Sequence, residues 1–177
     1  NDDHAGVAMR SKADGSAGTW PCGGFVFSNG GVVMDNGVCV LDSAEAIEAV
    51  QYYGQILNEA GPLGVGNYHW YECLNDYMQE AVAIGMDSSN FATDIENPEK
   101  SNAAGHTTYG AMVSGPGKQA KPNMWHWMAG INSKSENKAA AFLFLTWANS
   151  KPTCLMSSAL GLATTRTSAW ESDGFKS

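Results

Sequence analysis

Basic side chains are scarce in this chain of 177 residues. Lysine and arginine together number 10, against 18 aspartates and glutamates, which leaves a formal net charge of −8. No run of Lys or Arg offers a surface that could follow a phosphate backbone, so we expect no nucleic-acid partner. The same negative charge opposes adsorption to anionic membrane surfaces.

Long hydrophobic runs are also missing. The densest apolar segment, from Ala139 to Trp147, is much shorter than the roughly 20 residues that span a bilayer, so direct membrane insertion is not expected. The chain opens on polar residues, Asn1 to His4, and not on the apolar core of a signal peptide. That start is compatible with a cytosolic protein, a processed mature protein or an excised fragment.

Compact catalytic and metal-binding motifs are absent from the sequence. No two histidines lie three or four residues apart, and there is no H-E-x-x-H pattern, no G-x-S-x-G after a strand and no phosphate loop of the G-x-x-x-x-G-K-[ST] type. Glu72 and Asp87 could be imagined as paired carboxylates for glycoside hydrolysis, but any acidic chain offers such pairs. We therefore expect no enzyme activity, no metal and no cofactor.

Cysteine is present but not in motif spacing. The absence of a C-x-x-C pair excludes a zinc ribbon and a thioredoxin-type motif. An even number of cysteines permits disulfides in an oxidising compartment, while small buried thiols are at least as compatible with the pattern. The residues concerned are Cys22, Cys39, Cys73 and Cys154.

What the chain does contain is enough apolar material for a core. Hydrophobic residues make up 44% and charged residues 16% of the sequence, which argues against disorder. Short apolar or alternating runs bounded by turn residues predict β-strands. These runs lie at residues 5–10, 81–87, 106–117 and 124–131, with a further extended segment beginning at 32–35.

Helical patterns lie between and after these runs. Asp42 and Glu45 form a capping box that opens a helix, which Gly61-Pro62 ends. Ser133 and Glu136 predict a second capping box before a helix that is apolar on nearly every face, so that helix is expected to be buried on several sides, by neighbours that need not all lie in this chain. Further helices are expected at about 19–28 and 70–81 and within 90–102. The mixture of helices and strands predicts an α/β fold.

Tryptophan is the most informative residue type, with six in the chain. Trp125 and Trp127 flank His126 on a predicted strand, so both indoles would lie on one face of it. Core packing is the better interpretation from periodicity alone. The alternative is that the rings stack on the apolar C–H faces of a sugar or polyol.

Three charged residues occupy places where a ligand could meet them. Arg10 closes the first predicted strand, Asp87 ends the run at 81–87, and Arg166 lies in the segment TTRTS. Either arginine could be a surface residue or could direct its five N–H donors at hydroxyls or a carboxylate. Asp87 could cap the helix after it, accept hydrogen bonds from ligand hydroxyls, or do both.

The order of these segments resembles the family 1 extracellular solute-binding proteins of ABC importers, nearest to the sorbitol/mannitol-binding and general sugar-binding branch. The matching segments cover nearly the whole chain. In order they are GVAMR, SNGGVVMD after Trp20, LDSAEAIEAVQYYGQILNEAGPLGVGNYHWYE, YMQEAVAIGMDSS, NPEKSNAAGHTTYGAMVSGPG, MWHWMAGINSKSENKAAAFLFLTWANSK and GLATTRTS. One departure is Glu80-Ala81-Val82-Ala83-Ile84, where relatives often have G-x-A-A-M.

The resemblance implies a two-lobed α/β protein of the periplasmic-binding-protein type II, with a mixed sheet flanked by helices in each lobe. Such a protein closes on a sugar or sugar alcohol between its lobes and delivers it to the membrane permease of an ABC importer. It acts in the periplasm, or outside a Gram-positive cell on a membrane tether, and it is not an enzyme. The resemblance assigns ligand binding to Arg10, Trp20, Asp87, Trp125, Trp127 and Arg166.

The resemblance also implies that the chain is an internal fragment, an incomplete two-lobed protein. Residues 1–122 would be the second, C-terminal-type lobe, 123–150 a crossing strand and helix of the first lobe, and 151–177 a return segment to the second. We therefore expect the chain to expose hydrophobic surface near Phe142 to Trp147, or to cover it by oligomerising. A secreted glycoside hydrolase and a lectin-like carbohydrate-binding domain remain as alternative functions.

Overall fold

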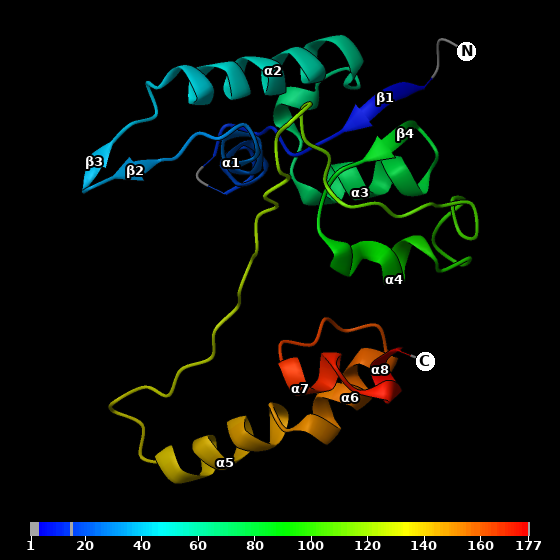
Figure 1. The fold of residues 1–177 in the computed structure, drawn as a ribbon. Coiled ribbons are helices and arrows are strands. Elements are labelled where there is room, and N and C mark those ends of the chain that lie inside the picture. Colours follow the sequence, from blue (N-terminus) through cyan, green and yellow to red (C-terminus); the bar gives the residue numbers. More distant parts are fainter. Residues whose placement is uncertain (1–3, 15, 177) are drawn as a thin grey trace. The chain divides into compact units, whose positions relative to one another are not determined.

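The computed structural model describes residues 4–14 and 16–176, and the chain forms two compact units, Asn1–Met124 and Trp125–Ser177. The centre of the first unit is a pair of parallel strands, β1 (Ala5–Ala8) and β4 (Val82–Gly85), in the register Ala5↔Val82 and Ala8↔Gly85. Both strands fall inside runs predicted from the sequence. A parallel pair needs a long crossover connection, and here the described chain between the strands contains three α-helices. These are α1 (Thr19–Ser28), α2 (Ala44–Ala60) and α3 (Trp70–Met78) (Figure 1).

The helices cover the two faces of this strand pair separately. Val7 and Met9 pack with Tyr53 of α2 and with side chains of α1, while Ala8 packs with Cys73 of α3. Successive side chains of a strand point to opposite faces, so this alternation places α1 and α2 on one face and α3 on the other. All five of these residues are less than a tenth exposed. The first unit therefore has a small two-sided α/β core.

The helix ends follow recognisable capping chemistry. The hydroxyl of Ser43 accepts the backbone N–H of Ala46, so Ser43, and not the predicted Asp42, caps α2. Gly61 ends that helix as predicted. A capping box that the sequence analysis did not identify opens α3, formed by His69 and Glu72.

The third helix ends at Met78 and not near residue 81. Glu80 adopts a positive φ of 58°, a conformation that breaks the helix and turns the chain into β4. A second tight turn lies in the hairpin of β2 (Met34–Asp35) and β3 (Val38–Cys39), where Asn36 and Gly37 both have positive φ, as a two-residue hairpin turn requires. The short helices of this unit are η1 (Val65–Asn67), η2 (Ser89–Phe91) and α4 (Ala92–Ile95).

Two of the predicted strands are wrong. Residues 106–117 and 124–131 are described throughout and contain no strand. Alternating hydrophobicity indicates which side chains share a face, but a strand also needs a neighbour for its backbone hydrogen bonds. Within the described residues these segments form no such ladder.

The second unit is helical, and its first helix differs from the prediction in two ways. The N-cap position of α5 (Lys138–Ala148) is Asn137, which forms no side-chain cap bond, so the predicted capping box of Ser133 and Glu136 is not formed. No described residue of α5 is buried, and Phe142, Leu143, Phe144 and Trp147 are each more than half exposed. The expected exposure of apolar surface at 142–147 is thus confirmed, and burial on several sides is not found within the described residues. The unit is completed by α6 (Lys151–Ala159), α7 (Thr167–Trp170) and α8 (Asp173–Lys176).

None of the helices in the described part of the chain is both long enough and apolar enough to cross a bilayer.

Candidate functional site

Two charged residues follow the parallel strands β1 and β4 at their carboxyl ends. Arg10 lies two residues beyond the end of β1, and Asp87 lies two residues beyond the end of β4. The backbone N–H of Met86 donates to the carbonyl of Ala8 at 3.1 Å, which continues the strand register toward these residues. The carboxyl ends of parallel strands are where open α/β sheets bind their ligands. This edge is therefore the candidate site of the first unit.

Arg10 and Asp87 form a bidentate ion pair. Nε of Arg10 donates to Oδ2 of Asp87 at 2.7 Å, and Nη2 donates to Oδ1 at 2.6 Å. The backbone N–H of Ser88 donates to the same Oδ1 at 2.6 Å. The two side chains are only 13% and 8% exposed. Parallel charge-assisted bonds of this kind fix the plane of the guanidinium as well as its position.

Trp20 of α1 completes the cluster. The Cζ atom of Arg10 lies 4.8 Å from the centre of the indole ring, a cation–π distance, so Arg10 occupies one face of that ring. The side chain of Asn123 donates to the carbonyl of Trp20, and the hydroxyl of Tyr53 donates to the carbonyl of Arg10. The structure thus brings together Arg10, Trp20 and Asp87, three of the six predicted site residues.

A cleft of about 330 Å³ adjoins Asp87. Its wall follows β4 from Ala83 into Ser89, and Cys73 and Tyr109 also line it. Burial raises the pKa of Cys73 to about 12, with the Asp87 carboxylate adding to the effect, so the thiol is protonated at neutral pH. Burial likewise raises the pKa of Tyr109 to about 12, helped by its hydrogen bond to Glu96. Both groups are therefore neutral beside the cleft.

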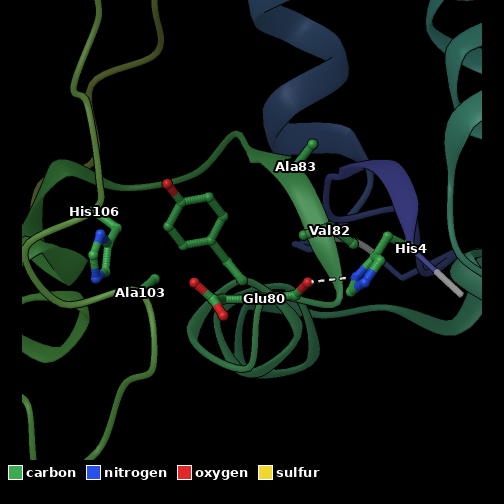
Figure 2. Close-up of a pocket in the computed structure, with 7 residues that line it drawn as sticks. His4, Glu80, Val82, Ala83, Ala103 and His106 are labelled. Carbon is green, nitrogen blue, oxygen red and sulfur yellow. Dashed lines mark hydrogen bonds between the residues drawn. The ribbon is translucent and has the colours of Figure 1, made fainter. Parts of the chain in front are cut away.

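A second hollow, of about 290 Å³, lies at the opposite, amino end of the strand pair, among His4, Glu80, Ala103 and His106 (Figure 2). His4 Nδ1 lies 2.8 Å from the carbonyl oxygen of Glu80, so this nitrogen is the one that carries the proton and donates. The described residues contain no group of three His, Cys, Asp or Glu side chains that could hold a metal ion. We assign no function to this hollow.

The aromatic pair of the second unit, Trp125 and Trp127, is in contact. The ring centres lie 5.8 Å apart with an angle of 61° between the ring planes, and the residues are 51% and 86% exposed. The rings lie together although the segment is irregular, so the strand argument for their common face was wrong. Their exposure shows that they do not form a core within the second unit.

Arg166 has structural partners. Its Nε donates to the hydroxyl of Ser168 at 2.9 Å, and its Nη1 donates to the carbonyl of Asn149, the C-cap of α5, at 3.0 Å. These bonds tie the start of α7 to the end of α5. Its hydrogen bonds go to these residues and not to either tryptophan, so the site role of Arg166 stays a prediction.

Sequence reasoning missed two residues that hold the first cluster, Tyr53 and Asn123. Tyr53 lies within the predicted helix that follows Asp42 and is buried, but nothing in the sequence pattern indicated its bond to the Arg10 carbonyl. Asn123 gave no signal at all. The sequence permits either disulfides or buried thiols, and in the structure all four cysteines are free thiols, with Cys73 and Cys154 buried and Cys39 exposed.

A parallel α/β unit with a charged and aromatic cluster at the carboxyl ends of its strands has the layout in which open α/β sheets bind their ligands. The family described as bacterial extracellular solute-binding protein matches residues 2–153, and this chain belongs to that family.

One curated relative is the erythritol/L-threitol-binding protein of Mycolicibacterium smegmatis. It is 27% identical over 110 residues, which are 62% of this chain and 23% of that protein. The chain therefore spans about a quarter of the length of that relative.

Solved structures show the same fold. Maltose-bound T. maritima MalE3 matches 99% of this chain with a TM-score of 0.88 at 21% identity. A ribitol complex of an ABC transporter solute-binding protein from Agrobacterium radiobacter K84 matches 96% with a TM-score of 0.78 at 23% identity. A D-mannitol complex from Agrobacterium vitis S4 matches 99% with a TM-score of 0.74 at 20% identity. The predicted solute-binding-protein fold is confirmed, and the chain spans 43% to 46% of these structures.

Proposed function

We propose that this protein binds a sugar or sugar alcohol without changing it chemically and delivers it to the membrane permease of an ABC importer. The observation that carries the proposal is the fixed Arg10–Asp87 pair at the carboxyl ends of β1 and β4, beside a cleft. The relatives support it, because their names and structures report erythritol or L-threitol, ribitol, D-mannitol and maltose as ligands. Membership of an extracellular family supports action outside the cytoplasmic membrane, in the periplasm or on a Gram-positive cell surface.

The chemistry of the cluster suits a hydroxyl-rich ligand. Arg10 has five N–H donors, two of which bond to Asp87, so donors remain for hydroxyl oxygens. In the second unit, Trp125 and Trp127 offer exposed aromatic faces on which the C–H face of a sugar can stack. We assign ligand contacts to both sets, with Trp20 supporting Arg10. The predicted lobes at 1–122, 123–150 and 151–177 remain part of this proposal, as does Arg166.

The glycoside hydrolase alternative needs a carboxylic acid that is protonated at neutral pH. Burial acts to raise the pKa of Glu72, but hydrogen bonds from the backbone N–H of His69, 2.8 Å away, from its own backbone N–H and from the Tyr71 hydroxyl together outweigh it, so the pKa of Glu72 lies below its usual value. Both carboxylate oxygens of Asp87 already accept hydrogen bonds from Arg10. Glu72 is thus favoured in its ionised form and Asp87 is already engaged by Arg10, which disfavours this alternative.

Calorimetric titration of the full-length protein with erythritol, L-threitol, ribitol, D-mannitol and maltose tests the proposal. We expect saturable binding of at least one of these compounds, with the ligand recovered unchanged by NMR. Arg10→Lys keeps the charge but loses the bidentate fork, so we expect it to weaken binding by about tenfold or more. Lys100→Arg, at the exposed pair with Asp94, is the control and should bind as the wild type does. No binding of any of the five compounds, or their conversion to product, would refute the proposal.

A further inference from the structure

We infer that the Arg10–Asp87 pair makes the ligand site selective for uncharged polyhydroxyl compounds, so that an analogue carrying a carboxylate or an amine in place of a hydroxyl is rejected. The inference rests on the proposed function and states which sugars and sugar alcohols that function accepts.

The first step is that the two charges compensate each other before any ligand arrives. Both carboxylate oxygens of Asp87 accept from Arg10, and one of them also accepts the backbone N–H of Ser88. Because both side chains are largely buried, water screens them weakly. A ligand at this edge therefore meets a local dipole with no net charge.

The remaining N–H donors of Arg10 are the groups that a neutral ligand can use. Two of the five N–H groups of Arg10 bond to Asp87, and the Arg10 side chain forms no other hydrogen bond within the part of the chain that the structure describes. The Trp20 ring covers one face of the guanidinium, so the remaining donors are presented along its edge. A hydroxyl oxygen can accept from them without disturbing the pair.

A ligand that carries a charge binds at this pair less favourably than a neutral one. A carboxylate could take the Nε and Nη2 donors that Asp87 uses only by displacing Asp87, which would leave a buried charge without a partner. If it did not displace Asp87, it would lie close to a like charge. A ligand amine has the mirror-image problem, since Arg10 repels it unless it replaces Arg10 at Asp87. Both substitutions should therefore weaken binding.

The net charge of the protein is an alternative explanation for the rejection of charged ligands, and it predicts a different result from the ion pair. A net charge of −8 also repels anions, but it attracts cations. General electrostatics thus predicts that the amine binds better than the neutral ligand, whereas the closed pair predicts that it binds worse. Measuring binding at about 0.15 M salt, where the screening length is about 8 Å, further reduces the contribution of the protein's net charge.

The experiment is a calorimetric comparison in the full-length protein. Ribitol, D-mannitol and maltose are compared with ribonate, mannonate and maltobionate, their carboxylate analogues, and with the 1-amino-1-deoxy derivatives of the two alditols. For each neutral compound that binds, we expect its acid to bind about 100-fold more weakly and, for an alditol, its amine at least about tenfold more weakly. An acid or amine within about threefold of its neutral parent overturns the inference and leaves the proposed function intact. Failure of every neutral compound to bind overturns both.

Asp87→Asn tests the pair directly, because it keeps the shape of the side chain and removes its charge. The acid-to-neutral affinity ratio should rise by at least about tenfold, since Arg10 is then an uncompensated cation. Asp94→Asn makes the same change at the exposed pair with Lys100 and should leave the ratio unchanged. If Asp87→Asn folds poorly, the double variant Arg10→Gln/Asp87→Asn leaves no unpaired charge, and its ratio should also rise. An unchanged ratio in the variants that fold overturns the inference.

Discussion

The two units use tryptophan in different ways. In the first unit Trp20 lies against Arg10 of the ion pair, and its backbone carbonyl accepts a hydrogen bond from Asn123, far along the sequence. In the second unit Trp125 and Trp127 contact each other on an irregular segment and are largely exposed. Hydrogen bonds are directional, and apolar contact is not. The first cluster is therefore suited to orienting a ligand, and the second to supplying apolar area.

The largest effect on stability is expected when the buried Arg10–Asp87 ion pair of the first unit is broken. Asp87→Ala leaves Arg10 without a partner at 13% exposure, so we expect the free energy of unfolding to fall by about 3 kcal/mol. Urea unfolding of the full-length protein measures it. Asp94→Ala, at an exposed pair, should cause no measurable change. Equal losses from the two substitutions would show that the Arg10–Asp87 pair has no special role.

At the exposed Trp127 ring of the second unit we expect the opposite: little effect on stability and a clear effect on ligand binding. Trp127→Ala should change the free energy of unfolding by less than about 0.5 kcal/mol, because the side chain is 86% exposed, yet weaken ligand binding by about tenfold. Met128→Ala removes an equally exposed neighbour and should leave affinity unchanged. Similar affinities for Trp127→Ala and Met128→Ala would rule out the stacking role.

A smaller effect should follow from loosening the backbone of the first cluster. Tyr53→Phe removes the hydroxyl that donates to the Arg10 carbonyl, and one lost hydrogen bond at a buried site costs about 1 kcal/mol. Thermal unfolding measures the loss. Tyr52→Phe alters a neighbour on α2 that is 56% exposed and should have no effect. A full-sized loss in Tyr52→Phe as well would mean that the Arg10 contact is not responsible.

High pH should weaken the first unit gradually. Burial raises the pKa of Cys73 from 9.0 to about 12 and also raises that of Tyr53, so the unfolded chain loses these protons first as the pH rises. Stability should therefore be full below about pH 9 and decline from there toward pH 12. Cys73→Ala should make the decline shallower in urea titrations at a series of pH values. An identical slope in wild type and variant would contradict the assignment.

The least perturbing test compares two thiols. Exposed Cys39 should react quickly with a thiol reagent at pH 8, whereas Cys73, 2% exposed and protonated, should react only on unfolding. Cys39→Ser should remove the fast phase. Rapid labelling of Cys73 in the folded protein would show that the wall of the cleft opens readily.

Local signals predicted much of the first unit. The helix at 19–28 has the predicted bounds, Gly61 ends α2, and both parallel strands lie inside predicted runs. Turn and cap chemistry and hydrophobic period act over a few residues, so they can be read from the chain directly. Errors arose where the outcome depended on a distant neighbour, as in the absent strands at 106–117 and 124–131.

The six predicted site residues likewise depended on more than local sequence signals. The six positions came from the resemblance and not from periodicity, which left Arg10 as a possible surface residue and Trp125 with Trp127 as core. Only the structure shows that Arg10 and Trp20 contact each other and that both tryptophans of the pair are exposed.

By itself, the sequence determined the acidic charge, the main helices and strands of the first unit, and the resemblance to solute-binding proteins. The tertiary structure alone decided that Arg10 meets Asp87. Those residues lie 77 positions apart, and no local rule connects them. They meet because a parallel register aligns the ends of β1 and β4, so that the residues leaving the two strands emerge at one edge with their charges in contact.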